Sequence, residues 1–457
     1  MEERDVVVIG GGTAGFMAAQ RIVMLGGKAA VVEEERLGGI CPYWGCIPMC
    51  FMDHCVEVLR LAREARNNGI NVGEVKIDYA RMISEKNRVV GGVVGGMEAR
   101  LRSVGVEVII GAGKLVSPTE VEITSADGRR EMIRAKKIII AAGSIARRYQ
   151  VPGAYGTGVL TTRELLNLNE LPGSLAVIGR GVAALELAAV WANLGSKVYL
   201  IARKPRLLPN EDEELAAFIR PSLEADGVRI YAGVDVVKIE DCPGGKMVTI
   251  SGDGVKQTVE AQFVVFALGQ QPNVESLGLE SAGITLSEGG IKTNEMMATS
   301  VRGIYAAGDV TGGMMLASIA MKQGTVAADN AMGRKATIDY RVVPRFIRTL
   351  PPIASVGMTE GEARERGLNI RVGRCPFELN PKARILRESR GFVKIIAKAT
   401  TGEILGVHIV GAQATELIHE PAAIMKMRGT AEDIAAFNHG HPCLHETVQR
   451  AAQSLLG

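Results

Sequence analysis

Aromatic residues are scarce in this chain: among 457 residues there are 2 Trp, 9 Phe and 8 Tyr. The core must therefore consist mainly of Val, Ile, Leu, Ala and Met side chains. An apolar run long enough to span a membrane is also missing, because the longest candidate, residues 175–194, is interrupted by Arg180 and Glu186. The formal net charge is only +3, so nothing suggests nucleic acid or an anionic membrane as a partner.

A secretory signal is not apparent, since the first apolar strand begins almost at Met1. Together with seven cysteines, this predicts a reducing compartment and a cytoplasmic location. In such a compartment two neighbouring cysteines are more often catalytic than structural. Cys41 and Cys46 form such a pair, and His441 and Glu446 lie far downstream. A cysteine pair that can close a disulfide, with a histidine and a carboxylate as acid and base, predicts a redox enzyme that works by thiol exchange.

A first glycine-rich loop contains Gly10, Gly12 and Gly15, between an apolar strand at residues 6–9 and an apolar helix. The first glycine allows a tight turn, the second lets the backbone approach a pyrophosphate, and the third lets the helix pack on the strand. The N–H groups and positive dipole end of the helix N-terminus favour phosphates. The following strand ends at Glu33, which can bind a ribose hydroxyl. This order predicts a dinucleotide site.

A second loop repeats the pattern with Gly179 and Gly181, but Ala184 replaces the third glycine. The next strand ends at Ala202, where an NAD site would have an acid. Three basic residues follow it: Arg203, Lys204 and Arg206. Because a 2′-phosphate is bound by cations, this pattern favours NADPH over NADH. The alternative is that these cations form only a solvated basic turn.

The length of the chain predicts two to four domains. Residues 1–147 have the pattern of βαβ units with a small meander, and residues 148–267 contain a second βαβ unit with an antiparallel segment at 247–250. A strand that leads into a helix start is indicated at residues 303–309. From residue 341 onward, apolar and polar residues alternate and two helices follow. This last pattern predicts an antiparallel sheet with flanking helices, an α+β domain.

With these features in this order, the chain resembles the class I, FAD-dependent pyridine nucleotide–disulfide oxidoreductases over nearly its whole length. The resemblance is carried by the two glycine-rich loops, the run from Gly38 to Pro48 and the motif from His441 to Glu446. Further positions match the family pattern near the cofactors: Gly143, Glu186, Gly269, Gly308 and Asp309.

The resemblance implies an α/β fold with two Rossmann-like dinucleotide-binding domains, for FAD and NAD(P), and a C-terminal α+β dimerisation domain. The FAD domain would comprise residues 1–147 and 268–340, and the NAD(P) domain residues 148–267. Residues 341–457 would form the dimerisation domain.

The resemblance also implies a route for electrons, from NADPH through FAD to a Cys41–Cys46 disulfide and on to a small disulfide or thiol substrate. Cys46 would face the flavin and Cys41 would meet the substrate. Pro48 is expected in the first turn of the next helix, so Cys46 lies near a helix N-terminus, which lowers the pKa of a thiol. His441, oriented by Glu446, would serve the cysteines of the other subunit of a homodimer.

Departures from the family pattern bear on the substrate. After the position of Pro48, most members have a small residue and then a lysine, which pairs with a glutamate near the flavin. This chain has Met49 and Cys50 at these two positions. Glu186 matches the glutamate and is therefore expected to lack its lysine partner. The stretch from Cys41 to Arg63 is similar to the 2-ketopropyl-coenzyme M oxidoreductase/carboxylase branch, which replaces the His–Glu pair by Phe–His. Two alternatives stay open: C–S cleavage of that type, which the retained His–Glu pair disfavours, and dihydrolipoamide dehydrogenase activity.

Other cysteines lie near the predicted site: Cys50, Cys55 and Cys443. Cys50 and Cys55 are expected to be buried packing residues, and the alternative for Cys50 is a third redox thiol. Cys443 either lines the pocket of the His–Glu pair or fills space in the packing. A metal site formed by Cys46, Cys50 and His54 is disfavoured, because three ligands from one helix seldom complete a tetrahedron. We therefore expect no metal.

Overall fold

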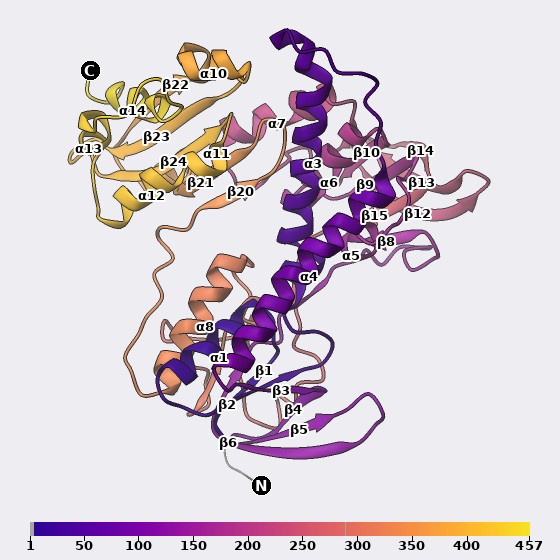
Figure 1. Ribbon diagram of the computed structural model, residues 1–457, viewed down its shortest axis with the longest axis vertical. Coiled ribbons are helices and arrows are strands. Elements are labelled where there is room, and N and C mark those ends of the chain that lie inside the picture. The colour runs from indigo at the N-terminus through magenta and orange to yellow at the C-terminus, as the bar shows by residue number, and fades with distance from the viewer. Residues whose placement is uncertain (1–3, 288) are drawn as a thin grey trace.

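The computed structural model describes residues 4–287 and 289–457. In Figure 1 the N-terminal sheet lies at the bottom, a second sheet unit in pink lies at the right, and the C-terminal domain in orange and yellow lies at the upper left. Within the described residues, no helix combines the length and the apolar composition that a membrane crossing requires.

The N-terminal sheet has the strand order β3-β2-β1-β6-β5-β4, and β19 also pairs with β6. Its largely buried centre is formed by β1 (Arg4–Ile9), β2 (Ala29–Glu33) and the end of β6 (Arg130–Ile140), which run parallel. The other strands are β3 (Glu107–Ile110), β4 (Ala112–Ser117), β5 (Glu120–Thr124) and β19 (Ile304–Ala306). Because β19 follows the second unit in the sequence, the chain returns to the first sheet late, as the family resemblance implies.

Helix α1 (Thr13–Met24) packs on this sheet and against α8 (Ala317–Ala331). Small buried residues such as Ala18 and Ala327 allow the two helices to approach closely. In Figure 1 they lie side by side, above the strands. The N-terminus of α1 is thereby fixed at the carboxyl end of β1.

Helices between β2 and β3 connect the first sheet to the second unit. They are α2 (Ile40–Trp44), α3 (Cys46–Glu64), the 3₁₀ turn η1 (Ala65–Asn68) and α4 (Tyr79–Ser103). The long helix α4 is not part of the sequence prediction; Asp78 caps it by accepting a hydrogen bond from the Arg81 amide at 3.0 Å. The predicted position of Pro48 in the first turn of a helix is confirmed.

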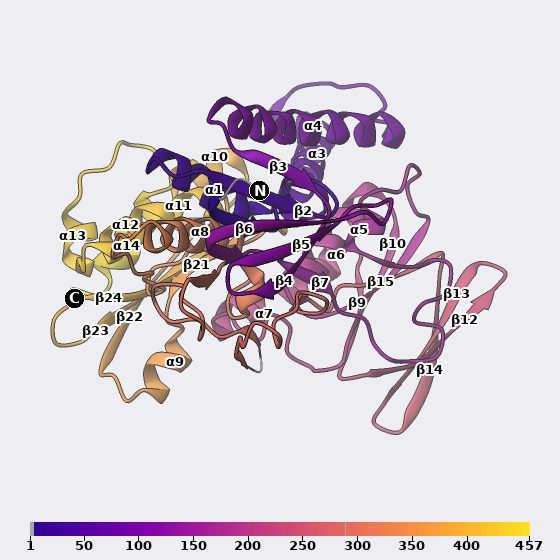
Figure 2. The ribbon, with the colours of Figure 1, turned by 90° about the horizontal axis from the view of Figure 1, so that it is seen from below.

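The second unit has a parallel sheet with the order β11-β10-β9-β15-β8. The strands are β8 (Val159–Thr161), β9 (Ser174–Ile178), β10 (Lys197–Ala202), β11 (Arg229–Ala232) and β15 (Phe263–Phe266). The helices are α5 (Thr162–Leu165), α6 (Val182–Leu194) and α7 (Glu213–Ala225). The predicted antiparallel segment is the middle strand of a small sheet, β12 (Asp235–Cys242), β13 (Gly245–Gly252) and β14 (Val255–Ala261). In Figure 2 this small sheet projects at the end opposite to the C-terminal domain.

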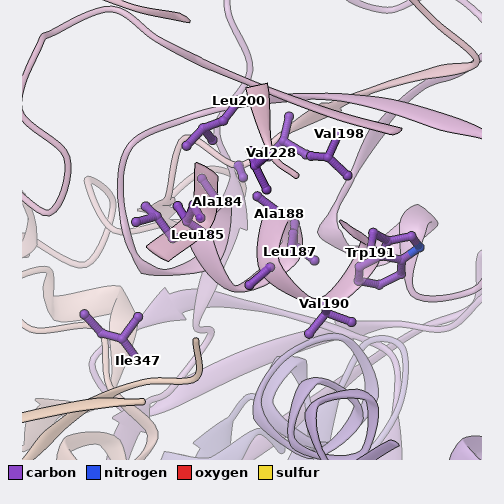
Figure 3. Packing of buried hydrophobic residues seen from close by; sticks show 14 of the residues in the cluster. Ala184, Leu185, Leu187, Ala188, Val190, Trp191, Val198, Leu200, Val228 and Ile347 are labelled. Atoms are coloured by element: carbon purple, nitrogen blue, oxygen red, sulfur yellow. The ribbon is translucent and has the colours of Figure 1, made fainter. Parts of the chain in front are cut away.

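Helix α6 is buried around most of its circumference and forms the centre of the largest apolar cluster. Trp191, one of the two tryptophans, is fully buried on it. Figure 3 shows the neighbouring side chains of α6 and β10, with Ile347 from the start of the C-terminal domain in the same cluster. Met49 and Met52 of α3 also belong to it, so α3, α6 and the chain around Ile347 share one core.

The predicted C-terminal antiparallel sheet is confirmed, with the order β20-β21-β24-β23-β22. Its strands are β20 (Arg345–Ile347), β21 (Ile353–Gly357), β22 (Ile370–Pro376), β23 (Phe392–Lys398) and β24 (Ile404–Val410). Between strands lie α9 (Glu360–Glu365), the 3₁₀ turn η3 (Phe377–Leu379) and α10 (Pro381–Leu386).

The expectation of two helices after these strands is wrong. The described chain there forms α11 (Ala414–Leu417), α12 (His419–Lys426), α13 (Ala431–Ala436) and α14 (Glu446–Gln453). Local caps divide the segment: Thr430 forms a capping box with Asp433 and begins α13 separately from α12.

Short elements connect the N-terminal sheet to the second unit. β7 (Ser144–Ala146) pairs antiparallel with β16 (Gln270–Pro272). They are accompanied by β17 (Leu286–Ser287), β18 (Gly290–Ile291) and the 3₁₀ turn η2 (Asp309–Thr311). The exact domain boundaries stay a prediction.

Candidate active site

The first glycine-rich loop has the geometry that its sequence predicts. Gly10 has φ +101°, and a Cβ there would lie 2.3 Å from the carbonyl oxygen of Ala141. A Cβ on Gly15 would lie 1.9 Å from the carbonyl oxygen of Gly10, so only glycine allows α1 to pack this closely on β1. Gly12, in contrast, begins α1 without a side-chain cap, and a Cβ there would meet only the Cα of Gly39 at 3.9 Å.

These residues fit the pyrophosphate of a dinucleotide such as FAD. The first N–H groups of α1 lack a side-chain acceptor, and the open space at Gly12 lies directly in front of them. A helix N-terminus of this kind favours phosphate oxygens. Gly11 N donates to Glu33 Oε2 at 2.6 Å, and the amides of Glu35 and Arg36 donate to Glu33 Oε1. Glu33 therefore holds the loop at the end of β2, in addition to its expected role at a ribose.

Replacing Gly15 with alanine is expected to weaken FAD binding by about tenfold or more, because relieving the overlap costs about 1–3 kcal/mol and moves α1. Flavin content after gel filtration and the Kd of the apoprotein for FAD measure this effect. Gly92→Ala is the matched control, since nothing lies within 4 Å of a Cβ there and Gly92 occupies an exposed position of α4. Full FAD retention by Gly15→Ala would contradict the prediction.

A second group of predicted cofactor residues comes together around η2. Ser144 Oγ donates to Asp309 Oδ2 at 2.7 Å, and burial raises the pKa of the Asp309 carboxyl while this hydrogen bond opposes the rise. Gly143, Gly269 and Gly308 all have positive φ, +71°, +85° and +80°. Gly143 directly precedes β7, Gly269 directly precedes β16 and Gly308 directly precedes η2. Because β7 pairs with β16 and Ser144 contacts Asp309, the structure brings the predicted segments into one region.

The second glycine-rich loop repeats the first in the second unit. Gly179 has φ +157°, and a Cβ there would lie 2.3 Å from the Ala267 carbonyl oxygen and 2.8 Å from the Ala184 Cβ. Gly181 begins α6 without a side-chain cap, and nothing lies within 4 Å of a Cβ at this position. The loop therefore fits a second pyrophosphate, and Ala184 takes the packing position of the third glycine.

The three predicted phosphate-binding cations have different environments. Arg203 and Lys204 are exposed just after β10, and Arg203 Nε lies 4.0 Å from Asp235 Oδ1. Arg206 instead donates from its guanidinium to the Glu211 carbonyl oxygen at 2.7 Å. Arg203 and Lys204 are thus the better placed of the three to meet a ligand.

Cys41 and Cys46 lie in two successive helices. Cys41 is in α2, and Cys46 is the first residue of α3. Their thiols are hydrogen-bonded to each other. The hydrogen bond from Cys41 and the positive charge of Arg348 lower the pKa of Cys46 to about 6 against the effect of burial. The same hydrogen bond, together with burial, raises the pKa of Cys41. These opposite directions favour the proton on Cys41 and the thiolate form of Cys46.

Aromatic residues between the two cysteines are held by cations from other segments. The Arg163 guanidinium lies 3.8 Å from the ring centroid of Trp44, and Arg163 also donates to the Glu35 carboxylate. Arg36 lies 5.5 Å from the ring centroid of Tyr43. The contact of Arg163 with Trp44 was not predictable, because Arg163 lies more than a hundred residues from Trp44 in the sequence and carries no motif of its own.

Glu186 lacks the lysine partner of the family pattern, as the sequence indicates, but another residue takes its place. Its carboxylate Oε1 accepts a hydrogen bond from the Arg348 backbone amide at 2.8 Å, and Arg348 Nη1 lies 3.9 Å from the same oxygen. Burial raises the pKa of Glu186 to about 7, and both contacts with Arg348 oppose this rise. The partner comes from the segment after β20, far from Glu186 in the sequence, so position 50 alone could not reveal it.

His441 and Glu446 form the predicted pair. His441 Nδ1 lies 2.9 Å from Glu446 Oε1, and the Cys443 amide donates to the same oxygen at 3.3 Å. Burial favours a protonated Glu446, but these two hydrogen bonds hold the pKa of its carboxyl below the ordinary value. Since Nδ1 faces a carboxylate, it carries the ring proton, and Nε2 is left for acid–base chemistry. The His441 side chain is 71% exposed.

The cysteine pair and the His–Glu pair lie apart in a single chain. In Figure 1, α14 is at the outer side of the C-terminal domain, well separated from α3, and Figure 2 agrees. His441 of the same chain therefore does not lie at the cysteine pair.

The remaining cysteines differ from expectation in one respect. Cys50 is exposed and is not the buried packing residue that the sequence suggests. Cys55 is half-buried, and burial raises the pKa of its thiol. Cys443 is also half-buried. Across the residues that the structure describes, no group of three His, Cys, Asp or Glu side chains is arranged to hold a metal ion.

Known protein families match both parts of the chain. Residues 4–324 match the family "Pyridine nucleotide-disulphide oxidoreductase", and residues 343–452 match the "Pyridine nucleotide-disulphide oxidoreductase, dimerisation domain". Mitochondrial dihydrolipoyl dehydrogenase of Pisum sativum is 35% identical over 460 residues, which cover 99% of this chain and 91% of the relative. Leghemoglobin reductase of Glycine max is also 35% identical, over 99% of this chain and 88% of its own length.

Solved structures agree with this assignment. LpdA from Mycobacterium tuberculosis superposes with a TM-score of 0.92 at 29% identity and full coverage of both chains, 100% each. The Cu(II) complex of the HOCl-induced flavoprotein disulfide reductase RclA from Escherichia coli gives a TM-score of 0.89 at 28% identity, with 99% of each chain covered. The predicted family and fold class are confirmed: the chain belongs to the pyridine nucleotide–disulphide oxidoreductases, flavin-dependent enzymes that move electrons between a nicotinamide nucleotide and a disulfide, and it carries the dimerisation domain that supports a homodimer.

Proposed function

We propose that this enzyme uses NADPH to reduce a small disulfide, with Cys41 and Cys46 as the redox pair and His441 and Glu446 of the partner subunit as the acid–base pair. The observation that carries the proposal is the hydrogen bond between the Cys41 and Cys46 thiols, with Cys46 as the first residue of α3. Bound FAD would supply hydride acceptance from the nicotinamide and electron transfer to the disulfide.

Because Cys41 is protonated in the proposed state, the mechanism requires His441 to act as a base. Cys41 becomes a nucleophile only when a base removes this proton, and the exposed Nε2 of His441 can accept it. Cys41 then attacks a substrate disulfide, one substrate thiolate leaves, and His441 returns the proton to it. The Cys46 thiolate next attacks Cys41, which releases the second substrate thiolate and restores the Cys41–Cys46 disulfide.

The thiolate assignment predicts a spectroscopic difference between two variants. Cys41→Ser should show a long-wavelength thiolate–flavin absorption band without reductant at neutral pH, because a serine hydroxyl at position 41 can still donate to Cys46 and the positive charge of Arg348 still lowers the pKa of its thiol. Cys46→Ser should lack the band. Absorption spectra of the two holoenzymes test this, and a band only in Cys46→Ser would exchange the two roles.

A comparison of substrates distinguishes disulfide reduction by NADPH from a second candidate reaction. Similarity to dihydrolipoyl dehydrogenases favours the oxidation of dihydrolipoamide with NAD⁺ as a second candidate. An anaerobic panel that compares NADPH with disulfides and dihydrolipoamide with NAD⁺ distinguishes the two directions. C–S cleavage with carboxylation is disfavoured because the chain keeps both His441 and Glu446.

We also propose a cytoplasmic location, where thiols outside the redox pair stay reduced.

A further inference from the structure

One arginine lies where α3, α6 and the C-terminal domain meet. Arg348 follows β20 directly, and its backbone amide and its guanidinium both face Glu186 of α6, at 2.8 Å and 3.9 Å from Oε1. Only 24% of its side chain is exposed. Its neighbour Ile347 is buried in the core shared with α3 and α6, so the backbone that carries Arg348 is fixed.

A second anchor holds β20 in place. Arg345 donates from Nε to Glu211 Oε1 at 2.9 Å, and Ser355 of β21 donates to the other oxygen of Glu211, which is buried. The strand that directly precedes Arg348 is therefore tied both to the second unit and to its own sheet. A charge held in this way needs little reorganisation to act on its surroundings.

Helix α3 presents one stripe toward Arg348. Cys46, Cys50 and Asp53 recur every three to four residues, which places them on one face of the helix. All three interact electrostatically with the Arg348 guanidinium. Because α3 begins at Cys46, its N-terminal dipole adds to the same positive environment.

We propose that Arg348, held by Glu186, is the positioning residue that supplies the fixed positive charge for the Cys46 thiolate, in place of the lysine that Cys50 replaces. This inference rests on the proposed role of Cys46 as the redox thiolate. An arginine suits the task, because its guanidinium stays charged at every working pH. Cys50 remains an exposed thiol beside this charge.

Several charged or titratable groups share this environment. Those that face Cys46 are Cys41 of α2, Arg348 and Asp309 of η2. Those that face Arg348 are Glu186 of α6 and Cys46, Cys50 and Asp53 of α3. Burial raises the pKa of Asp53 to about 6, and that of Glu186 lies at about 7. The two carboxyls therefore lose charge below neutrality, whereas Arg348 does not.

The test is a pH titration of the long-wavelength band in the Cys41→Ser holoenzyme with and without Arg348→Met. Removing a nearby opposite charge raises the pKa of a thiol by about 1 unit or more, so the midpoint of the titration should rise by about that amount. Arg348→Lys should keep most of the original midpoint. Adding Cys50→Lys to Arg348→Met should lower the midpoint again, since it returns a cation to the same face of α3.

The matched control is Arg60→Met, which removes an arginine of α3 that pairs with Glu388 and does not face Cys46. It should leave the midpoint unchanged. A second readout is the pH dependence of Cys46 alkylation by iodoacetamide in the reduced holoenzyme, resolved by peptide mass spectrometry. Arg348→Gln carries the same prediction and retains a polar group if Arg348→Met does not fold.

The possible outcomes separate the two claims. An unchanged midpoint and an unchanged alkylation profile after loss of Arg348 would overturn the inference and leave Cys46 as the redox thiolate. Absence of the band in Cys41→Ser with Arg348 intact would overturn the proposed function itself. A raised midpoint that Cys50→Lys reverses supports a charge effect, because loss of packing at position 348 would not be repaired from α3.

Discussion

Alanine in place of His441 is expected to lower the rate of disulfide reduction by about a hundredfold to ten thousandfold, the usual contribution of general acid–base catalysis. Without His441, the proposed site has no assigned base that removes the proton of Cys41. The substrate thiolate that leaves also loses its proton donor. Reduction of the enzyme by NADPH should be unaffected, because His441 takes no part in that step. Stopped-flow measurement of the two half-reactions separates these effects.

A matched control is available in the same segment. His445→Ala removes a neighbouring histidine that lies 3.6 Å from Glu420 and has no assigned role at the cysteines. It should retain turnover within a few-fold of the wild type, a range that reflects ordinary structural adjustment. If His441→Ala reduced disulfides as fast as His445→Ala does, the acid–base role of His441 would be wrong.

The second large effect concerns the nicotinamide nucleotide. Each charge-assisted contact to a phosphate contributes about 1.5–3 kcal/mol, so Arg203 and Lys204 together should favour NADPH over NADH by about a hundredfold or more in kcat/KM, even after solvent screening. The 4.0 Å pair of Arg203 with Asp235 is exposed and competes weakly. The double variant Ala202→Glu/Arg203→Ala should narrow or invert the preference by placing an acid at the ribose.

Arg220→Ala is the control for the loss of a positive charge, since the Arg220 side chain on α7 is partly exposed and pairs only loosely with Glu224 at 3.5 Å. It should keep the wild-type ratio. Equal use of NADPH and NADH by the wild type would show that the cations after β10 form only a solvated turn. The dihydrolipoyl dehydrogenase type of function would then gain support.

Local patterns predicted the parts of the site that depend on neighbouring residues. The glycines of both loops were predictable because close approach leaves no room for a Cβ, as at Gly15 and Gly179. The start of α3 at Cys46 was predictable from Pro48, which is tolerated only in the first turn. The link between His441 and Glu446 also depends on a short, local spacing.

Contacts between distant segments could not be predicted in the same way. Arg348 reaches Glu186 across 162 residues, and neither position shows a pattern that names the other. The cation–π contact of Arg163 with Trp44 is of the same kind. The exposure of Cys50 was also missed, because a cysteine in an apolar helix usually packs inside, whereas the stripe that contains Cys46 and Asp53 faces the site.

The central claim is that the redox cysteines of one subunit work with His441 of the other. Mixing Cys41→Ser with His441→Ala subunits tests it most directly. Random exchange should restore about a quarter of wild-type turnover, because half of the dimers are mixed and each mixed dimer has one site with both residues intact. No recovery in a sample shown by mass spectrometry to contain mixed dimers would contradict the shared site.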